Sequence, residues 1–569
     1  MKANETITRR NFIRLSGMTG ATLMLGLHWT SQAKDAQVLT GAAAEQLGVS
    51  LNAFILIDTS GKVTIMNHRA EMGQGAYQAV PSILAEELEV DMNAINIVFA
   101  PGNEKKYGSQ ITGGSSTVRG AYKRLGKLGA TAREMLIEAA TKKWNASRTE
   151  CYAENGKVFH APTKRSFHYG QLVEDASKLE PPKDVELKLP KDYKIIRKPM
   201  PRPDLPMKTN GTAVFGLDFK LPGMMYAVVE RSPRFNGKVK SFDDSATKKV
   251  PGVKHVFKVQ REVFDHMREG VAVVADSFYA ANQGRKALKV EWDDTGFEHV
   301  STELLYSRMK EAVEKGEGVN SFKTKGNAND AFSKSAKKVT AVYETPYESH
   351  SCMEPLNCVA HVQEGKCEIW GPIQTPGWAQ EAVSKLLGMT MEQVTVNMTF
   401  LGGGFGRKAF NDFPLEAAAI SKEIKGPVQV IWTREDDMTA GPFRPGMVYK
   451  CEGGLSDSGW LSSYKVIGAG QNMGLQGPNA DFSSYNDSIT EGFLETYFDG
   501  IPNWSFGDVP LKSAVPVMWW RSVYSSTNGF AFESFMDELA TEAGQDPLDF
   551  RKRLFRSGRY HNVANILAE

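Results

Sequence analysis

Short runs in which hydrophobic and polar residues alternate recur along the chain, and a period of two is typical of β-strands. The clearest runs are 51–67, which turns at Ser60-Gly61, then Ile95–Phe99, 394–400 and 428–432. Longer segments with hydrophobic residues three and four positions apart predict helices. These segments are 125–144, Asp412–Ile424 and 530–543. The sequence therefore predicts an α+β or mixed α/β fold.

Two polar segments divide the chain into regions. The first, 170–207, is rich in Lys, Pro and Asp, and the second, 296–335, is polar, so we expect both to be connections. Between them, short strands separated by Pro-Gly turns and a helix at 280–287 predict a compact α+β module. Further on, Gly453 and Gly459 mark a predicted hairpin. A chain of 569 residues is long enough for several such domains.

Composition and charge narrow the possible functions. The formal net charge is +2 and 24% of residues are charged, so no global field favours a nucleic-acid partner. The five cysteines include no CxxC pair and no spacing typical of an iron–sulfur cluster. If the protein transfers electrons, we expect another subunit to carry them onward. Glycine is frequent, 52 of 569, which fits a protein whose backbone approaches a ligand.

The first candidate site is a glycine-rich turn, LGGGFGRK at 401–408, between a predicted strand and a predicted helix. Glycine can adopt positive φ and lets the backbone come within hydrogen-bonding distance of a ligand. Arg407 adds a cation suited to a phosphate or another oxyanion. The turn is a poor dinucleotide fingerprint, because Arg407 stands where the last glycine of GxGxxG belongs. A simple strand-to-helix turn is the alternative.

Two other segments carry candidate chemistry. EMGQG at 71–75 and TGGSST at 112–117 each precede a predicted helix, where free N–H groups and hydroxyls suit anion binding. A capped turn is the alternative for the second segment. His350, Cys352, Cys358 and His361 are close in the sequence, but their spacing matches no familiar metal site. We expect structural roles for these four residues.

Residues 1–33 resemble a twin-arginine export signal. Arg9 and Arg10 precede Phe12, and the hydrophobic run that follows at 18–29 is too short to span a bilayer comfortably. Ser31 and Ala33 offer small residues for cleavage. This route carries folded proteins, so it suits an enzyme that acquires a complex cofactor before export. The expected location is the periplasm, with attachment to the membrane left open.

Together, EMGQG, TGGSS, MEP at 353–355, GGGFGR and a tryptophan-flanked Arg-Ser pair resemble the molybdopterin-binding subunit of the xanthine dehydrogenase family. In most of that family the GQG and serine-rich motifs follow the glycine loop, whereas here they precede it. This permuted order is similar to the large (beta) subunit of isoquinoline 1-oxidoreductase and its relatives. The resemblance implies a multidomain molybdopterin-binding fold, with cofactor-binding regions at 50–175 and 336–569 and a hammerhead-type α/β domain at 208–293.

The resemblance also implies roles for individual residues. Gln380, six residues after Gln374, resembles the glutamine that hydrogen-bonds to an oxo ligand of the metal. The glycine-loop residues that resemble those facing the molybdenum are Gly403, Gly404, Phe405 and Gly406. Residues that resemble the pterin and phosphate contacts, or a second loop at the metal, are Gln74, Gly75, Gly114, Ser115, Ser116, Arg407 and Arg521. No protein ligand to the metal is expected, because the pterin dithiolene holds it.

The implied cofactor is molybdenum with molybdopterin in its cytosine dinucleotide form. The implied partner is a small subunit with [2Fe-2S] clusters, from which electrons pass to an acceptor such as a cytochrome c. The implied reaction is hydroxylation of an N-heteroaromatic compound or an aldehyde with water-derived oxygen. Two residues depart from the family: Tyr524 stands where many relatives have glycine, and Ala409 where purine-oxidising members carry an acid. The second departure argues against a xanthine substrate.

The last expectation concerns the end of the chain. The family continues to a GxGE segment whose glutamate acts as general base, and residues 1–569 contain no such segment. We expect either a truncation or a separate polypeptide that supplies it. The alternative to an enzyme is therefore a catalytically incomplete cofactor-binding or assembly fragment.

Overall fold

The computed structural model describes residues 53–264, 266–295, 300–316, 323–476, 490–493 and 498–569, together with the backbone of Leu23–His28 and Gln37–Thr40. The chain forms two compact units. The first comprises Met1–Ala227, Leu356–Gly404 and Lys408–Ile431, and the second comprises Val228–Pro355, Phe405–Arg407 and Trp432–Glu569. We describe each unit by itself.

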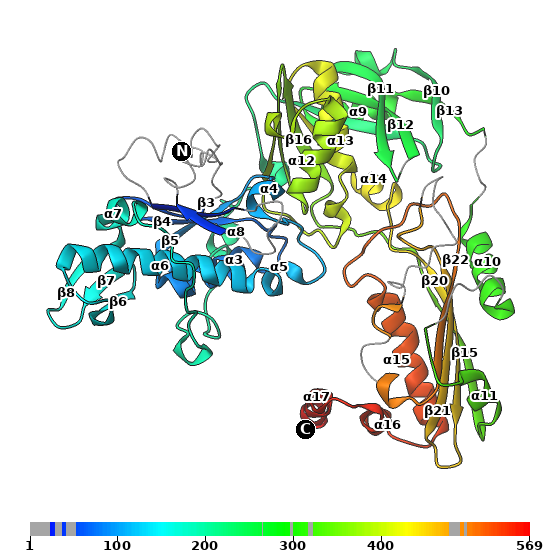
Figure 1. The fold of residues 1–569 in the computed structure, drawn as a ribbon. Helices are drawn as coiled ribbons and strands as arrows, with labels where there is room; N and C mark the ends of the chain where they lie inside the picture. Colours follow the sequence, from blue (N-terminus) through cyan, green and yellow to red (C-terminus); the bar gives the residue numbers. More distant parts are fainter. Residues whose placement is uncertain are drawn as a thin grey trace. The chain divides into compact units, whose positions relative to one another are not determined.

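The N-terminal sheet of the first unit has the strand order β2-β1-β3-β4-β5. Its strands are β1 (Leu23–His28), β2 (Gln37–Thr40), β3 (Ala53–Ile57), β4 (Val63–Asn67) and β5 (Ile95–Phe99). Ile65 of β4 lies opposite Ile55 in an antiparallel pair and opposite Ile97 in a parallel pair. Helices α3 (Ala76–Leu88) and α6 (Tyr122–Trp144) run along one face of this sheet (Figure 1). The strands and the α6 helix predicted here are confirmed.

This sheet and its helices share one hydrophobic core, in which Ile65, Leu84 and Leu128 are fully buried. Burial of each such side chain contributes about 1.5–3 kcal/mol. The smaller elements of the unit are α4 (Glu104–Tyr107), α5 (Ser116–Arg119), β6 (Cys151–Glu154), β7 (Lys157–His160), β8 (Arg165–His168), α7 (Val173–Ser177) and α8 (Leu205–Thr209).

Five strands of a seven-stranded sheet belong wholly or partly to the first unit, in the order β9-β19-β16-β17-β18. These strands are β9 (Met225–Arg231), β16 (Asn357–Gln363), β17 (Lys366–Gly371), β18 (Val394–Met398) and β19 (Val428–Ile431). β17 and β18 are parallel and are joined through helix α12 (Pro376–Leu387). Helix α13 (Asp412–Ile424) has the predicted bounds. The glycine-rich turn lies between the end of β18 and the start of α13, as predicted.

Residues 186–196, within the predicted connection at 170–207, are held against α3. The buried carboxylate of Glu86 accepts hydrogen bonds from Lys188 Nζ at 2.6 Å and from the backbone N–H groups of Ile195 and Ile196 at 2.7 and 2.9 Å. The neighbouring carboxylate of Glu87 accepts the backbone N–H of Lys188 at 3.1 Å. We call residues 186–196 the strap.

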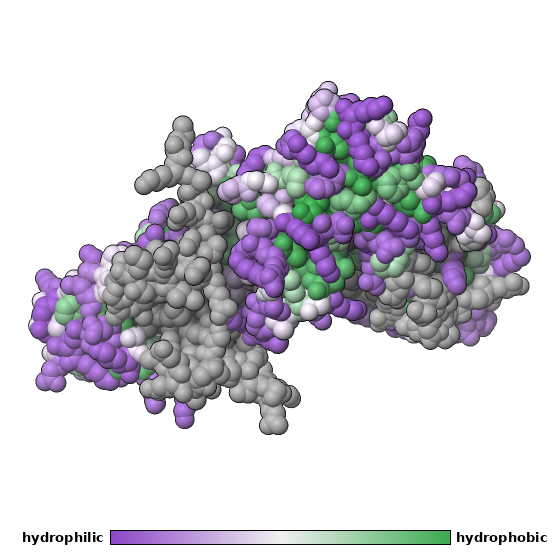
Figure 2. Space-filling model, turned by 90° about the horizontal axis from the view of Figure 1, so that it is seen from above, coloured by the Kyte–Doolittle hydropathy of each residue, from purple (hydrophilic) through white to green (hydrophobic). Residues whose placement is uncertain are grey.

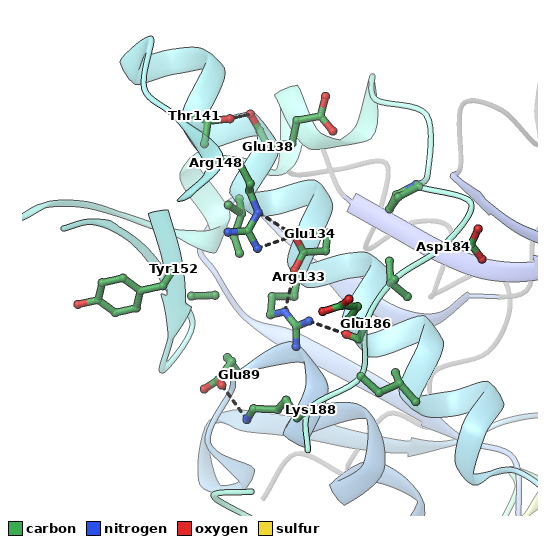
Figure 3. Close-up of a pocket in the computed structure, with 15 residues that line it drawn as sticks. Glu89, Arg133, Glu134, Glu138, Thr141, Arg148, Tyr152, Asp184, Glu186 and Lys188 are labelled. Carbon is green, nitrogen blue, oxygen red and sulfur yellow. Dashed lines mark hydrogen bonds and ion pairs between the residues drawn. The ribbon is translucent and has the colours of Figure 1, made fainter. Parts of the chain in front are cut away.

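A cavity of about 830 Å³ lies between α6, β6 and residues 182–188, and Figure 3 shows its charged lining. Glu134 accepts from Arg148 at 2.6 Å and from Arg133 at 3.2 Å, and Lys188 pairs with Glu89 at 2.7 Å. These ion pairs join the strap and β6 to the helices. We therefore assign this cavity a structural role.

The second unit contains a sheet of order β14-β22-β21-β20-β15. Its strands are β14 (Lys323–Lys325), β15 (Lys337–Thr345), β20 (Met447–Leu455), β21 (Leu461–Gly470) and β22 (Trp504–Pro510). β20 and β21 form the predicted hairpin. Tyr449 and Cys451 face helix α15 (Ser525–Glu542), whereas Val448 faces helix α10 (Thr302–Lys315) on the other side (Figure 1).

The predicted connection at 296–335 is wrong, because it contains α10, β14 and α11 (Ala328–Ser333). Leu305, Met309 and Val313 of α10 are buried against the sheet. These residues are four positions apart and form a single stripe on a helix whose other faces are polar. Because the segment as a whole is polar, its sequence did not predict a helix with this hydrophobic stripe.

The remaining part of the second unit matches the predicted α+β module. Strands β11 (Val253–Val263) and β12 (His266–Ala275) form a hairpin, and β10 (Lys238–Asp243) pairs with β13 (Lys289–Asp293). Helix α9 (Phe278–Ala287) packs on β12. The other helices of the unit are α14 (Arg434–Thr439), α16 (Pro547–Leu554) and α17 (Gly558–Ala568).

The predicted leader is only partly described. Arg9, Arg10, Ser31 and Ala33 lie outside the described residues. The backbone of Leu23–His28 forms β1, which pairs antiparallel with β3. Within the described part of the chain, no helix is both long and hydrophobic enough to span a membrane. The face seen in Figure 2 is mostly hydrophilic, with hydrophobic patches interrupted by polar residues.

Candidate functional site

The EMGQG loop is shaped by its own glutamate. The carboxylate of Glu71, which is fully buried, accepts the backbone N–H groups of Gly73 at 2.8 Å, Gly75 at 3.2 Å and Tyr77 at 2.8 Å. It also accepts from Arg202 Nη2 at 3.0 Å. Because a helix N-terminus carries partial positive charge, a carboxylate stabilises the start of α3.

Gln74 contributes to the same loop. Its amide oxygen accepts the Met72 N–H at 2.8 Å and its amide nitrogen donates to the Ala70 carbonyl at 2.9 Å. Both polar atoms of the Gln74 side chain therefore form hydrogen bonds with the backbone of residues 70–72. Gly75 has φ of 94°, and the space where its side chain would begin is open.

Four motif segments that are far apart in the sequence meet in the first unit. Thr112 Oγ1 accepts the Ala70 N–H at 2.9 Å, and the Thr112 carbonyl accepts Gln374 Nε2 at 2.6 Å. The Leu401 N–H donates to the Glu71 carbonyl at 3.0 Å. EMGQG, TGGSS, Gln374 and the start of the glycine loop thus form one cluster, which we call the loop cluster.

The serine-rich segment is not a side-chain-capped turn. Gly114 and Ser115 both have positive φ, 57° and 53°, and Ser115 makes no side-chain cap to α5. Ser116 Oγ donates to the Gly113 carbonyl at 2.8 Å, and Arg119 donates to the Gly114 carbonyl at 3.0 Å. No atom of the described residues lies within 4 Å of the point where a Gly114 side chain would begin. The backbone is therefore open to a neighbour at this position.

Gln374, and not Gln380, is the glutamine beside the glycine loop. A β-carbon on Gly404 would lie 3.0 Å from Gln374 Oε1 and 2.9 Å from Met72 Sδ. Gln374 Oε1 is buried and has no hydrogen-bond partner among the described residues. Gln374 lies between the end of β17 and the start of α12, and this strand-to-helix position is the signal that could have identified it.

The role predicted for Gln380 stays a prediction, and the contacts of its side chain do not favour it. Its amide nitrogen donates to the carbonyl oxygens of Met391 at 2.8 Å and Val394 at 2.9 Å. Both N–H bonds are committed to backbone, so Gln380 fixes α12 to the turn before β18. No donor remains on this side chain for an oxo ligand.

In the second unit, the glycine loop contacts the tryptophan pair. A β-carbon on Gly406 would fall on the carbonyl oxygen of Trp519, and φ of Gly406 is 109°. The ring of Phe405 stacks on Trp520 with centroids 6.3 Å apart and an interplanar angle of 18°. His350 Nε2 lies 2.8 Å from the same Trp519 carbonyl.

His350 is neutral at this position. Burial lowers the pKa of His350 to about 3. Because a carbonyl only accepts, Nε2 of the neutral ring donates to Trp519 O. His350 therefore fixes the tryptophan segment. No group of three or more His, Cys, Asp or Glu side chains able to hold a metal ion occurs in the described residues.

The phosphate-binding role predicted for Arg407 stays a prediction, and the contacts of its side chain are of another kind. Its side chain is buried, with the guanidinium 5.3 Å from the ring centroid of Trp432. Arg231 and Arg261 lie over the same ring at 4.1 and 4.6 Å. Stacking of guanidinium groups on indole is a favourable packing interaction, so Arg407 anchors the end of the glycine loop.

Arg521 is exposed and begins a strained turn. Ser522 and Val523 have φ of 71° and 51°. A positive φ is rare for a β-branched residue such as Val523. The buried hydroxyl of Tyr524 accepts the Met473 N–H at 3.0 Å and donates to the Gln471 carbonyl at 3.1 Å. Tyr524, where many family members have glycine, therefore anchors this turn.

The loop cluster fits an organic group approached by backbone. Among the described residues, it offers open glycine positions at Gly75 and Gly114 and an amide oxygen of Gln374 without a hydrogen-bond partner. Such positions suit the hydrogen-bonding rings of a pterin, whose own sulfur atoms hold a metal.

Two models of the molybdopterin cofactor-binding domain match the chain, one over residues 17–228 and one over residues 313–555. Subunit beta of isoquinoline 1-oxidoreductase from Brevundimonas diminuta is 28% identical over 99% of this chain and 77% of its own length. The membrane-bound aldehyde dehydrogenase (pyrroloquinoline-quinone) from Gluconacetobacter polyoxogenes is 28% identical over 97% of this chain and 73% of its own.

Solved structures with the same fold are multidomain molybdenum hydroxylases. Quinoline 2-oxidoreductase from Pseudomonas putida 86 aligns over 63% of this chain and 50% of that chain, with a TM-score of 0.51 and 19% identity. Aldehyde oxidoreductase from Desulfovibrio gigas aligns over 68% and 47%, with a TM-score of 0.51 and 20% identity. This chain thus spans about half the length of these structures. By its two cofactor-binding domains and its relatives, the chain belongs to the molybdopterin-binding subunits of the xanthine dehydrogenase family.

Proposed function

We propose that this chain is the large subunit of a molybdenum hydroxylase that oxidises an N-heteroaromatic compound or an aldehyde. The observation that carries the proposal is the loop cluster, in which Gln374 Oε1 lies beside Gly404 and has no hydrogen-bond partner in the described part of the chain. When bound, the cofactor supplies transfer of water-derived oxygen to an electrophilic carbon and accepts two electrons. The protein positions the cofactor and forms hydrogen bonds with it.

Each part of the loop cluster has a task in this proposal. The buried carboxylate of Glu71 fixes the conformation of the EMGQG loop through hydrogen bonds with its backbone. Gly114 allows the serine-rich backbone to approach the cofactor. Gln374 holds one end of its amide on Thr112 and presents the other end beside Gly404. That end can accept a hydrogen bond from a ring N–H or from water, which orients the bound group.

Electrons are proposed to leave through a small [2Fe-2S] subunit and then to an acceptor such as a cytochrome c. All five cysteines are buried and unbridged. Burial raises the pKa of the Cys367 thiol to about 12 and that of Cys358 well above its usual range. Among the described residues, no group of three or more His, Cys, Asp or Glu side chains is placed to hold a metal ion, which supports clusters on a partner.

We further propose the cytosine dinucleotide form of the cofactor and export to the periplasm by the twin-arginine route. The permuted motif order supports the first and the Arg9-Arg10 pair supports the second. Metal analysis and nucleotide release on the chain purified with its partner test the cofactor. About one molybdenum and one cytidine nucleotide per chain is the expected result. An assembled and catalytically active complex that contains neither would contradict the proposed function.

A further inference from the structure

The second unit contains a cavity of about 840 Å³ beside the tryptophan pair. Four aromatic side chains line it: Phe235, Tyr347, Phe443 and Trp520. Ligand cavities in proteins usually hold roughly 300–1,000 Å³. This one is large enough for a compound with two fused rings.

The walls of the cavity are fixed by backbone hydrogen bonds. Glu348 and Arg444 exchange two of them, at 3.3 and 2.8 Å. Phe443 accepts the Met518 N–H at 2.8 Å and donates its own N–H to Pro516 at 2.9 Å. Three chain segments are thereby joined side by side. These bonds hold the aromatic walls in position, and a preorganised cavity lowers the entropy cost of binding.

The cavity also adjoins the glycine loop within the second unit. Trp520, one of its walls, stacks on Phe405 of that loop. His350, another lining residue, lies next to Gly406, since a β-carbon there would be 3.6 Å from His350 Nε2. A molecule in the cavity therefore lies near the segment that we assign to the cofactor.

The charged groups of the lining are paired. Glu348 forms an ion pair with Arg444 at 2.9 Å, and Arg234 forms one with Asp294 at 3.1 Å. His350 is neutral because burial lowers its pKa to about 3. An anionic ligand would thus enter a cavity whose charges are already balanced, and burying an unpaired carboxylate is costly.

We infer that this cavity binds an uncharged planar aromatic compound and discriminates against ring carboxylates. Its role as the substrate cavity rests on the proposed function, but binding itself does not. Aromatic side chains favour offset or edge-to-face contacts with a flat ring. Phe235 and Phe443 already make such an edge contact, at 6.1 Å and 78°, and hydroxyls of Ser301 and Ser349 can contact a ring nitrogen.

Calorimetric titration of the purified full chain with quinoline, nicotinate and hexanal at neutral pH tests the inference. Quinoline is expected to bind about tenfold more tightly than either of the others. Phe443→Ala and Phe235→Ala should each weaken quinoline binding about five- to tenfold. Tyr279→Ala is the matched control, because Tyr279 is a 72% exposed aromatic residue outside the cavity.

A charge variant provides an independent test. Glu348→Gln removes the partner of Arg444 and should tighten nicotinate binding several-fold, with quinoline little changed. Equal affinities for quinoline and nicotinate, or quinoline binding unaffected in both phenylalanine variants at wild-type melting temperature, would overturn the inference. Normal quinoline binding by an assembled and catalytically active complex that contains no molybdenum would instead contradict only the proposed function.

Discussion

The carbonyl oxygen of Trp519 occupies the place that a side chain on residue 406 would need. Gly406 also has φ of 109°, a region open to glycine alone. The close contact explains why the glycine loop and the tryptophan pair can lie together in the second unit.

Gly406→Ala should therefore displace the tryptophan segment. We expect a loss of about 1–3 kcal/mol in stability from backbone strain and clash, together with a fall in molybdenum content. Thermal unfolding and metal analysis measure the two effects. Gly529→Ala is the control, since Gly529 lies in α15 with open space around it. If the Gly406→Ala protein has the melting temperature and the molybdenum content of the wild type, this loop is not part of the cofactor site.

The two glutamines should behave oppositely. Gln380→Ala leaves the carbonyls of Met391 and Val394 without their donor and should cost about 1–3 kcal/mol of stability, with turnover per bound molybdenum unchanged. Gln374→Ala should lower molybdenum content or turnover at a smaller cost in stability. Chemical denaturation, metal content and activity separate the two. The reverse pattern would restore the role first predicted for Gln380.

The strap should depend on the ionised form of Glu86. Burial opposes ionisation, but hydrogen bonds from Lys188 and the backbone of residues 194–196 outweigh it and lower the pKa of Glu86. A lowered pKa gives stability that is present above the pKa of the unfolded chain and is lost as pH falls through the folded value. Glu86→Gln should thus cost about 1–3 kcal/mol at neutral pH and less in acid.

Hydrogen exchange at the amides of Ile195 and Ile196 measures release of the strap directly. Glu174→Gln is the control, because Glu174 is an exposed acid paired with Lys178. Unchanged exchange at Ile195 and Ile196 in Glu86→Gln would show that the strap is held by other contacts.

Asp508 of β22 should have the opposite pH dependence. Burial raises the pKa of Asp508 to about 6. A raised carboxyl pKa means that the folded state binds the proton more tightly, so stability falls as pH rises from about 4 to about 6. Asp508→Asn should therefore raise the melting temperature above pH 6, whereas the exposed turn variant Asp457→Asn should not. Destabilisation by Asp508→Asn at neutral pH would contradict this assignment.

Export should depend on the arginine pair itself. Changing Arg9 and Arg10 to Lys keeps the charge but alters a signal read by a receptor. Fractionation should find the variant in the cytoplasm and the wild type in the periplasm. Equal periplasmic amounts of both would contradict the twin-arginine proposal.

Local patterns predicted much of the fold. Alternation identified β3, β4 and β5, and the helix at Asp412–Ile424 has the predicted bounds. These elements were predictable because burial on one face imposes its period on the sequence. The motif segments were also recognised individually, and the structure brings EMGQG, TGGSS and the glycine loop together.

Long-range partners could not be predicted in the same way. Nothing in the local sequence shows that Glu86 receives N–H groups more than a hundred positions away. Gln374 precedes α12 and Gln380 lies within it, and only the packing of this segment decides which of the two side chains lies beside the glycine loop. Arg407 carries charge, which suggested a phosphate, but its neighbour in space is Trp432.

The internal cap formed by Glu71 has a consequence for biogenesis. Its carboxylate already receives the amides of Gly73, Gly75 and Tyr77, so the loop keeps its shape without help from a guest molecule. Polypeptide folding and cofactor insertion can then be separate events in time. The subunit can therefore fold first and receive the cofactor as the last step of its assembly.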